Sequence, residues 1–112
     1  MKPLLTKDLT VFLKRFHHFK NGHFKHFEVL SPTQFKVILT GQDDSRAFDW
    51  VSVEFELTGA SSANLLENSK LSLIDMEDGI NISHNGTDFA FELYNSTFFI
   101  ECKTIKYQEG AF

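Results

Sequence analysis

Four of the five histidines in this 112-residue sequence gather within residues 12–27, FLKRFHHFKNGHFKHF. They are His17, His18, His23 and His26. Neutral imidazole is a common ligand for zinc, copper and nickel, so a metal site is the first chemistry to consider. A chelating pair needs a spacing of i,i+4 on a helix or i,i+2 on a strand, and neither spacing occurs here. We therefore predict no metal site and no cofactor.

The same segment contains five of the thirteen phenylalanines, four basic residues and no carboxylate. Basic and aromatic residues together are typical of proteins that bind single-stranded nucleic acid, where lysines meet phosphates and rings stack on bases. Most of these phenylalanines, however, fall on a stripe that a small domain must bury, and the isoelectric point is near 5.7. Nucleic acid is thus a disfavoured partner. If it bound, Lys14, Arg15, His18 and Lys25 would contact the phosphates.

Two other residues have side chains that take part in catalysis in many enzymes, His84 and Cys102. His84 lies beside a hairpin turn, and no sequence feature places a general base next to either residue. Cys102 alternates with Phe98 and Ile100, which predicts a buried, inert thiol. Asp75-Met76-Glu77-Asp78-Gly79 lacks the ligand spacing of a calcium loop. We predict a protein that is not an enzyme and has no catalytic residues.

Carboxylates are the remaining chemical groups, and they recur on the polar sides of expected strands. Glu54 and Glu56 alternate with apolar residues, as do Glu92 and Glu101. If these strands belong to one sheet, their acids gather on its outer surface among exposed aromatic rings. In many docking surfaces, aromatic rings anchor the partner protein and charges steer its approach. The predicted partner-binding residues are Trp50, Glu54, Glu56, Asp88, Glu92, Tyr94, Phe99 and Glu101.

The distribution of charge along the chain supports a basic partner. Residues 1–36 hold seven basic and two acidic residues, a net +5, whereas residues 37–112 hold four basic and thirteen acidic residues, a net −9, and together these give the total of −4. If the halves fold side by side, their charges either neutralise one another across one domain or form two faces of opposite sign. The sequence therefore favours a non-enzymatic protein that presents an acidic, aromatic-dotted sheet face to a basic protein, as small bacterial inhibitor or immunity proteins do. That analogy is one of charge and size.

Four alternatives remain open. An enzymatic interpretation would require His84 or Cys102 to meet a carboxylate in a cleft. The acidic rows also suit an ordinary solvated sheet face, and thirteen phenylalanines also suit a cavity between helix and sheet that holds a small apolar ligand. An open edge strand would allow a homodimer.

One amphipathic helix is expected near the start of the chain, over about residues 6–20. Thr6 is the expected N-cap and Asn21-Gly22 the left-handed stop. Apolar residues recur there at steps of three and four, which places them on one stripe. The stripe comprises Leu5, Leu9, Phe12, Leu13, Phe16 and Phe19.

The rest of the chain, residues 23–108, predicts an antiparallel sheet. Val51, Val53, Phe55 and Leu57 alternate with polar residues, the pattern of a strand with one buried face. Asp78-Gly79 and Asn85-Gly86 predict tight hairpins. The expected strands are 23–30, 35–39, 48–58, 71–75, 80–84, 87–94 and 97–107, with a loop at 59–69 that contains one helical turn around Leu65 and Leu66.

These elements predict a single α+β domain over residues 1–112, in which the N-terminal amphipathic helix packs on a curved antiparallel meander of six or seven strands, a half-barrel or a small sandwich. The chain has one cysteine and no signal-peptide core, so we expect a cytoplasmic protein. No apolar stretch approaches the roughly 18 residues that span a bilayer, so we expect no membrane contact.

Overall fold

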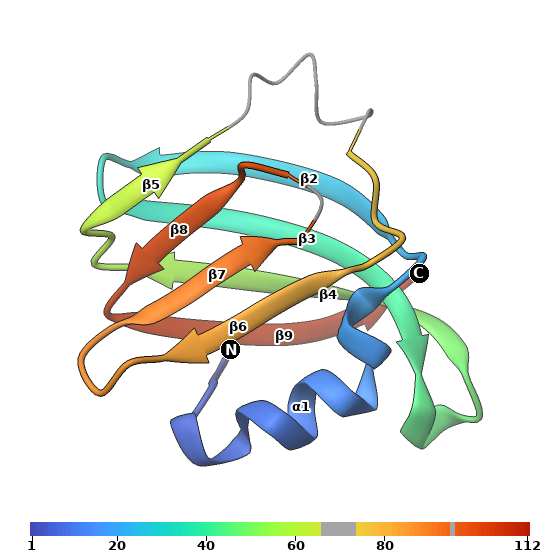
Figure 1. Ribbon diagram of the computed structural model, residues 1–112. Helices are drawn as coiled ribbons and strands as arrows, with labels where there is room; N and C mark the ends of the chain where they lie inside the picture. The colour runs from blue at the N-terminus through green and yellow to red at the C-terminus, as the bar shows by residue number, and fades with distance from the viewer. Residues whose placement is uncertain (66–73, 95) are drawn as a thin grey trace.

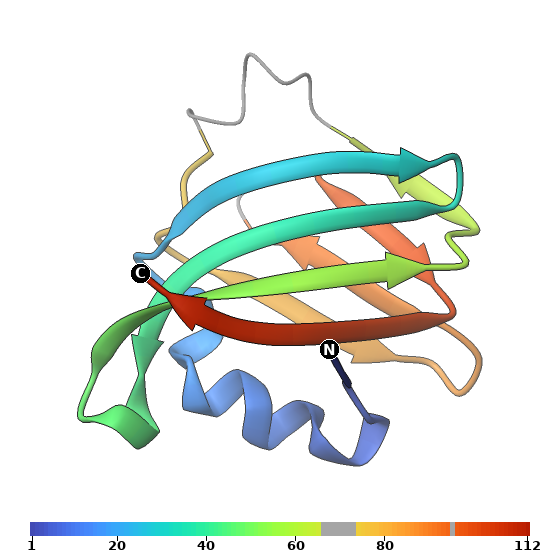
Figure 2. The ribbon, with the colours of Figure 1, turned by 180° about the vertical axis from the view of Figure 1, so that it is seen from behind.

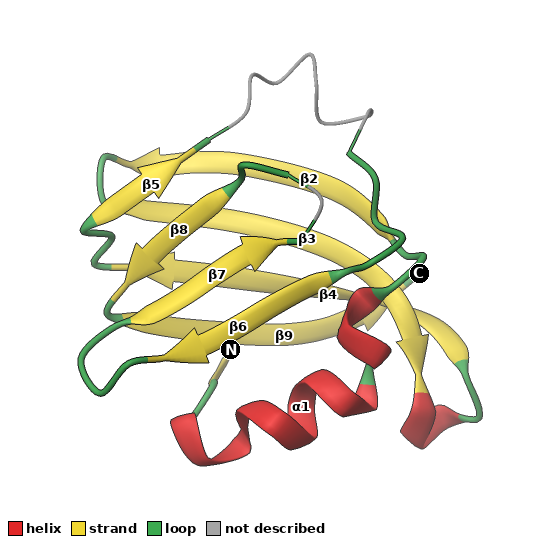
Figure 3. Cartoon of the chain, in the orientation of Figure 1, coloured by secondary structure: helices red, strands yellow, loops and turns green. Residues whose placement is uncertain are grey.

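The structure is a computed structural model that describes residues 1–65, 74–94 and 96–112. Within these residues, nine strands form two antiparallel sheets, accompanied by one short α-helix and three 3-10 turns (Figures 1 and 3). The strands are β1 Lys2–Pro3, β2 His23–Ser31, β3 Gln34–Asp43, β4 Asp49–Thr58, β5 Ser62–Asn64, β6 Ile80–His84, β7 Phe89–Leu93, β8 Phe99–Cys102 and β9 Thr104–Ala111. The helix is α1 Leu9–Arg15, and the 3-10 turns are η1 Thr6–Asp8, η2 His17–Phe19 and η3 Asp44–Arg46.

The two sheets lie face to face. One has five strands in the order β1-β9-β4-β3-β2, and the other has four in the order β5-β8-β7-β6. Seen from behind, the five-stranded sheet lies in front of the four-stranded one (Figure 2). The predicted α+β class with antiparallel strands is confirmed. The predicted count of six or seven strands is not, and neither is a half-barrel, because the chain divides its strands between two sheets.

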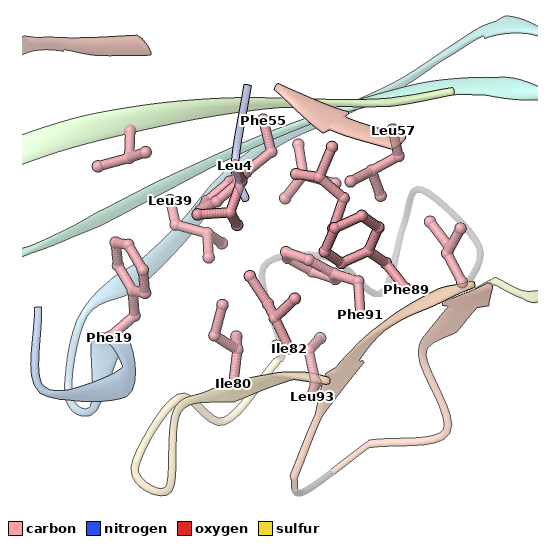
Figure 4. Close-up of a cluster of buried hydrophobic side chains, with 14 of the residues drawn as sticks. Leu4, Phe19, Leu39, Phe55, Leu57, Ile80, Ile82, Phe89, Phe91 and Leu93 are labelled. Atoms are coloured by element: carbon pink, nitrogen blue, oxygen red, sulfur yellow. The ribbon is translucent and has the colours of Figure 1, made fainter. Parts of the chain in front are cut away.

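Alternation along β4 builds the core as predicted. Val53, Phe55 and Leu57 are fully buried, and they point toward the four-stranded sheet. The rings of Phe55 on β4 and Phe91 on β7 meet edge to face with centroids 5.4 Å apart, which joins the two sheets. Figure 4 shows Leu39, Phe55 and Leu57 facing apolar side chains from β6 and β7. The hydrophobic core therefore lies between the sheets.

The expected strand 97–107 is in fact two strands, and it carries the chain from one sheet to the other. β8 ends at Cys102, and the amide of Lys103 donates to the carbonyls of Thr58 and Gly59. β9 then pairs with β4. The buried positions show the same break, because Cys102 and Ile105 are both buried although they are three residues apart. That shift in the period of two is the sequence signal for the bend.

The helix is shorter than predicted, because α1 ends at Arg15 and a left-handed turn follows. His17, His18 and Phe19 have φ of 53°, 56° and 57°. Such backbone costs on the order of 1 kcal/mol or more for each non-glycine residue. Burial of Phe19 offsets part of this cost: its side chain is fully buried and stacks on Phe16 with centroids 5.1 Å apart. A Cβ atom at Gly41 would lie 2.8 Å from the Phe19 ring, so Gly41 makes room for it.

The helix does not cover an open sheet face, because the second sheet occupies that place. Instead α1 lies along the side of the molecule where β6 and β9 run (Figure 1). The Phe12 ring reaches Tyr107 of β9 with centroids 4.8 Å apart. The predicted stripe is buried except for Leu5, which is 44% exposed. Thr6 is not a helix N-cap, since it lies inside η1.

The segment between β4 and β6 agrees less well with expectation. β5 occupies Ser62–Asn64, within the predicted loop. Leu66 of the predicted helical turn and residues 71–73 of the predicted strand lie outside the described residues, and Ile74 and Asp75 are not in a strand. None of the described helices has the length and apolar character needed to cross a bilayer.

Candidate functional site

The eight predicted partner-binding residues lie on both sheets. Trp50, Glu54 and Glu56 belong to β4 in the five-stranded sheet. The other five belong to or flank β7 and β8 in the four-stranded sheet: Asp88, Glu92, Tyr94, Phe99 and Glu101. The outer faces of the two sheets point in opposite directions, since the core lies between them (Figure 2). The eight residues therefore form two groups.

The outer face of the five-stranded sheet carries charges of alternating sign. Glu56 lies opposite Lys36 on β3 and Lys106 on β9, and Lys36 lies in turn opposite Glu28 on β2. Opposite charges on directly paired strand positions attract one another. The row Glu28–Lys36–Glu56–Lys106 thus places each carboxylate opposite at least one lysine, and the Glu56 carboxylate also accepts a hydrogen bond from the side-chain amide of Gln34.

The other two predicted residues of this face also have partners. Glu54 accepts a hydrogen bond of 3.4 Å from the side-chain amide Nε2 of Gln108. Trp50, which is 36% exposed, lies with its ring centroid 5.6 Å from that of Phe112 and 5.8 Å from that of His23. Trp50 therefore belongs to an aromatic cluster at one end of the sheet rather than to an acidic surface.

The outer face of the four-stranded sheet is different. Its described strands contain no lysine or arginine. One cross-strand row places Glu92 beside Phe99, and the next places Glu101 beside Ala90. Glu92 and Glu101 are diagonal neighbours, for which the typical Cα separation is about 7–8 Å. Among the residues that the structure describes, neither forms an ion pair.

Polar and small side chains complete these two rows. The first row runs through Asn81, Glu92, Phe99 and Asn64, and the second runs through Ser83, Ala90, Glu101 and Ser62. We call the surface formed by these eight residues the acidic face. It holds two carboxylates and one partly exposed ring, Phe99, without a cation.

Asp88 and Tyr94 lie at opposite ends of the acidic face. The Asp88 carboxylate pairs with the Lys103 ammonium at 2.6 Å and is only 15% exposed, so its charge is neutralised. Tyr94 is 52% exposed and lines a hollow of about 460 Å³ with Asp78, Lys20 and His18. Of these two predicted residues, only Tyr94 adds an accessible group.

A buried ion pair between Arg15 and Asp43 has no counterpart in the sequence predictions. Arg15 Nε and Nη2 donate to the two carboxylate oxygens of Asp43 at 2.9 and 2.7 Å. Asp43 is fully buried, and Ser45 adds hydrogen bonds from its amide and hydroxyl. The Arg15 guanidinium also lies 4.7 Å from the Phe16 ring centroid. This pair fastens the end of α1 to the end of β3.

The charges around Asp43 balance. Arg15 Nη2 also meets Glu109 Oε1 at 2.6 Å, and Arg46 lies 3.4 Å from both Asp43 and Glu109. The Arg15 hydrogen bonds hold the pKa of Asp43 well below its usual range, against the opposing effect of burial. One sequence signal could have indicated the buried position of Asp43. Buried positions recur at every second residue along β3, and this alternation continues past Gly41 and directs Asp43 into the protein.

The four clustered histidines make separate contacts. His18 Nδ1 lies 3.1 Å from the Ile80 carbonyl, and since that oxygen only accepts, Nδ1 carries the hydrogen. His23 bonds Thr40, His26 meets Glu28 at 3.2 Å, and the His17 ring stacks on Phe48. In the described part of the chain, no three histidine, cysteine or acidic side chains converge as metal ligands would.

Neither His84 nor Cys102 is arranged for catalysis. Cys102 is fully buried, as the alternation predicted, and burial together with the nearby Asp88 carboxylate raises the pKa of its thiol to about 12. A thiol with that pKa is almost wholly protonated at neutral pH and is a poor nucleophile. His84 Nδ1 accepts a hydrogen bond from the Gly86 amide at 3.0 Å, which ties this ring to its own hairpin.

The core phenylalanines pack against one another. The hollow beside α1, where Phe12 meets Tyr107, measures about 190 Å³, below the roughly 300–1,000 Å³ of most ligand pockets. A wider groove of about 760 Å³ lies along the last residues of β9. Its lining residues are Met1, Lys2, Arg46, Asp49, Trp50, Val51 and Tyr107 to Phe112.

Comparison of the chain with protein-family models, with curated proteins and with solved structures found no match.

Proposed function

We propose that this chain is a non-enzymatic binding protein whose acidic face docks on a basic region of a protein partner. The observation that carries the proposal is the pair Glu92 and Glu101. Both side chains are partly exposed, and neither has a cationic neighbour on the described strands of its sheet. Glu54 and Glu56, by contrast, already have partners on their own sheet.

The chemistry of the acidic face suits an arginine or lysine of the partner. One cation placed between Glu92 and Glu101 would interact with both carboxylates, and the Phe99 ring would contact its aliphatic stem. Charges of this kind mainly raise the association rate and select the partner, while rings supply contact area. The other side chains of the acidic face are small or polar, so a flat surface of the partner can approach the two carboxylates closely.

An inhibitor-like or immunity-like role follows from this surface. A rigid sheet face that covers a basic surface excludes other ligands from it, and it needs no chemistry of its own. The burial of Cys102 and the structural hydrogen bond of His84 support a role without catalysis.

The test is affinity capture from an extract of the source cells with two matched double variants. Glu92→Lys with Glu101→Lys reverses the acidic face, whereas Glu54→Lys with Glu56→Lys reverses the same number of charges on the opposite sheet. We expect the first variant to lose the captured partner by about tenfold or more, and the second to retain it.

Circular dichroism should show that both variants are folded. Retention of the partner by the Glu92/Glu101 variant would contradict the proposal, as would equal loss by both variants.

A further inference from the structure

We infer that the groove along β9 binds an extended peptide segment of a partner protein, which adds a strand to the five-stranded sheet. The inference concerns a site apart from the acidic face and does not depend on it. The groove runs along the edge of β9 that β1 leaves uncovered. β1 pairs Lys2 with Tyr107 and Pro3 with Lys106, and Gln108 to Ala111 have β4 as their strand neighbour on the other side only.

The backbone of β9 presents hydrogen-bonding groups to this groove. Leu4 donates its amide to the Ile105 carbonyl at 2.8 Å, so Ile105 faces the β1 edge. Alternate residues of a strand direct their amide and carbonyl to the same side. By this alternation the amides and carbonyls of Tyr107 and Glu109 and the amide of Ala111 face that edge too, whereas the Ala111 carbonyl accepts a hydrogen bond of 3.0 Å from the Ser52 hydroxyl of β4. Pro3, which has no amide hydrogen, lies at a position that needs none. Past Tyr107, the amide and carbonyl of Glu109 and the amide of Ala111 are therefore left for the groove.

The other long edge of the same sheet is protected against strand addition. β2 shows register shifts between Phe24 and His26 and between Val29 and Ser31. Bulges are a usual means by which edge strands avoid pairing with other chains. The register of β9 with β4 is regular from Thr104 to Ala111. β9 is thus the edge that accepts a strand.

The side chains around the groove favour a neutral peptide with an aromatic residue. Arg46 pairs with Glu109 at 3.4 Å, and Lys2 and Asp49, which also line the groove, have opposite charges. Gly110 has no side chain, and the rings of Trp50, Tyr107 and Phe112 also line the groove. An aromatic ring of the peptide laid across Gly110 would contact these rings.

The arrangement of β9 also defines the register of the occupant. The peptide residue opposite Gly110 supplies the aromatic ring and directs its own amide away from β9. Its two neighbours direct their amides toward Glu109 and Ala111. Main-chain hydrogen bonds then give affinity and the ring gives selectivity, as in other cases of strand addition.

The experiment is a nitrogen-15 NMR titration of the whole chain with the peptide acetyl-Thr-Thr-Phe-Thr-Thr-amide. We expect shifts at Tyr107 to Phe112 and at Trp50, and loss of binding when the threonine amides that flank phenylalanine are N-methylated. N-methylation of the phenylalanine itself should be tolerated. Ala111→Pro removes an amide that faces the groove and should weaken binding about tenfold, whereas Ala111→Val should retain it.

Several outcomes would overturn the inference. These are absence of shifts at millimolar peptide, shifts at β2 or on the acidic face instead, and equal binding by the Ala111→Pro and Ala111→Val variants. Changes at β9 that depend on protein concentration without peptide would show a second copy in the groove and would also overturn it. Unchanged shifts of β6 and β7 in both variants would show that the fold is intact.

Discussion

Two sets of carboxylates in this protein differ in what surrounds them. Asp43 is fully buried and receives two hydrogen bonds from Arg15 and two from Ser45. Glu92 and Glu101 lie on an outer sheet face whose described strands hold no lysine or arginine. The first arrangement uses charge to fix the end of a helix against a strand. The second leaves two carboxylates without an ion pair among the described residues.

This difference shows that the number of acidic residues on a strand does not by itself indicate a binding surface. Glu54 and Glu56 were as conspicuous in the sequence as Glu92 and Glu101, yet cross-strand partners account for them. A carboxylate that the fold has already satisfied gains little from a partner, because it must give up an existing contact. The acidic face is a candidate site because its two carboxylates lack such contacts among the described residues.

The largest effect is expected from Asp43→Ala. Removing one member of a buried ion pair typically costs about 3–5 kcal/mol; we expect the lower end here because Arg15 keeps Glu109 as a partner and its side chain is 28% exposed. Urea unfolding measures the loss of free energy. The matched control is Asp88→Ala, whose partner Lys103 is 55% exposed, with an expected loss of about 0–1 kcal/mol. Equal losses would contradict the distinction between buried and exposed pairs.

Acid should reveal the same buried pair. The pKa of Asp43 is lower in the folded protein than in the unfolded chain, so its contribution to stability is complete above the unfolded pKa of about 4. That contribution declines as the pH falls from about 4 toward the folded pKa. The urea midpoint of the wild type should therefore decrease more steeply below pH 4 than that of Asp43→Asn. Parallel pH profiles for the two proteins would refute this assignment.

A smaller effect on stability should separate the two sheet faces. Glu56→Lys places a third cation between Lys36 and Lys106, and like charges on paired strands cost up to about 1 kcal/mol. Glu92→Lys meets no cation on the described strands of its sheet and should change stability by less than about 0.5 kcal/mol. Thermal unfolding of the two single variants makes the comparison. A larger loss for Glu92→Lys would show that Glu92 has a structural role.

The sequence predicted the parts of the fold that depend on local pattern. Alternation from Val51 to Leu57 identified the buried face of β4, and Asn85-Gly86 marked the turn between β6 and β7. The end of α1 at Arg15 was not predictable from helical period, because the stripe continues into the left-handed turn where Phe19 is buried. Long-range packing decides that boundary.

The candidate site was predicted only in part, for a related reason. Glu92, Phe99 and Glu101 were correctly placed on polar strand faces, but which strands share a sheet depends on pairings between distant segments. The bend at Lys103 sends β8 and β9 to different sheets, and it separates Glu54 from Glu92. The Arg15–Asp43 pair joins residues 28 positions apart, and no local pattern indicates it.

The most direct test of the central claim is a titration of the nitrogen-15-labelled protein with a short arginine-rich peptide, read residue by residue. We predict that amide shifts concentrate on the acidic face, at Asn81, Ala90, Glu92, Phe99 and Glu101, and that the double change of Glu92 and Glu101 to lysine removes them. Shifts concentrated on β3 and β4 around Glu54 and Glu56, or unchanged binding by the double variant, would contradict the account.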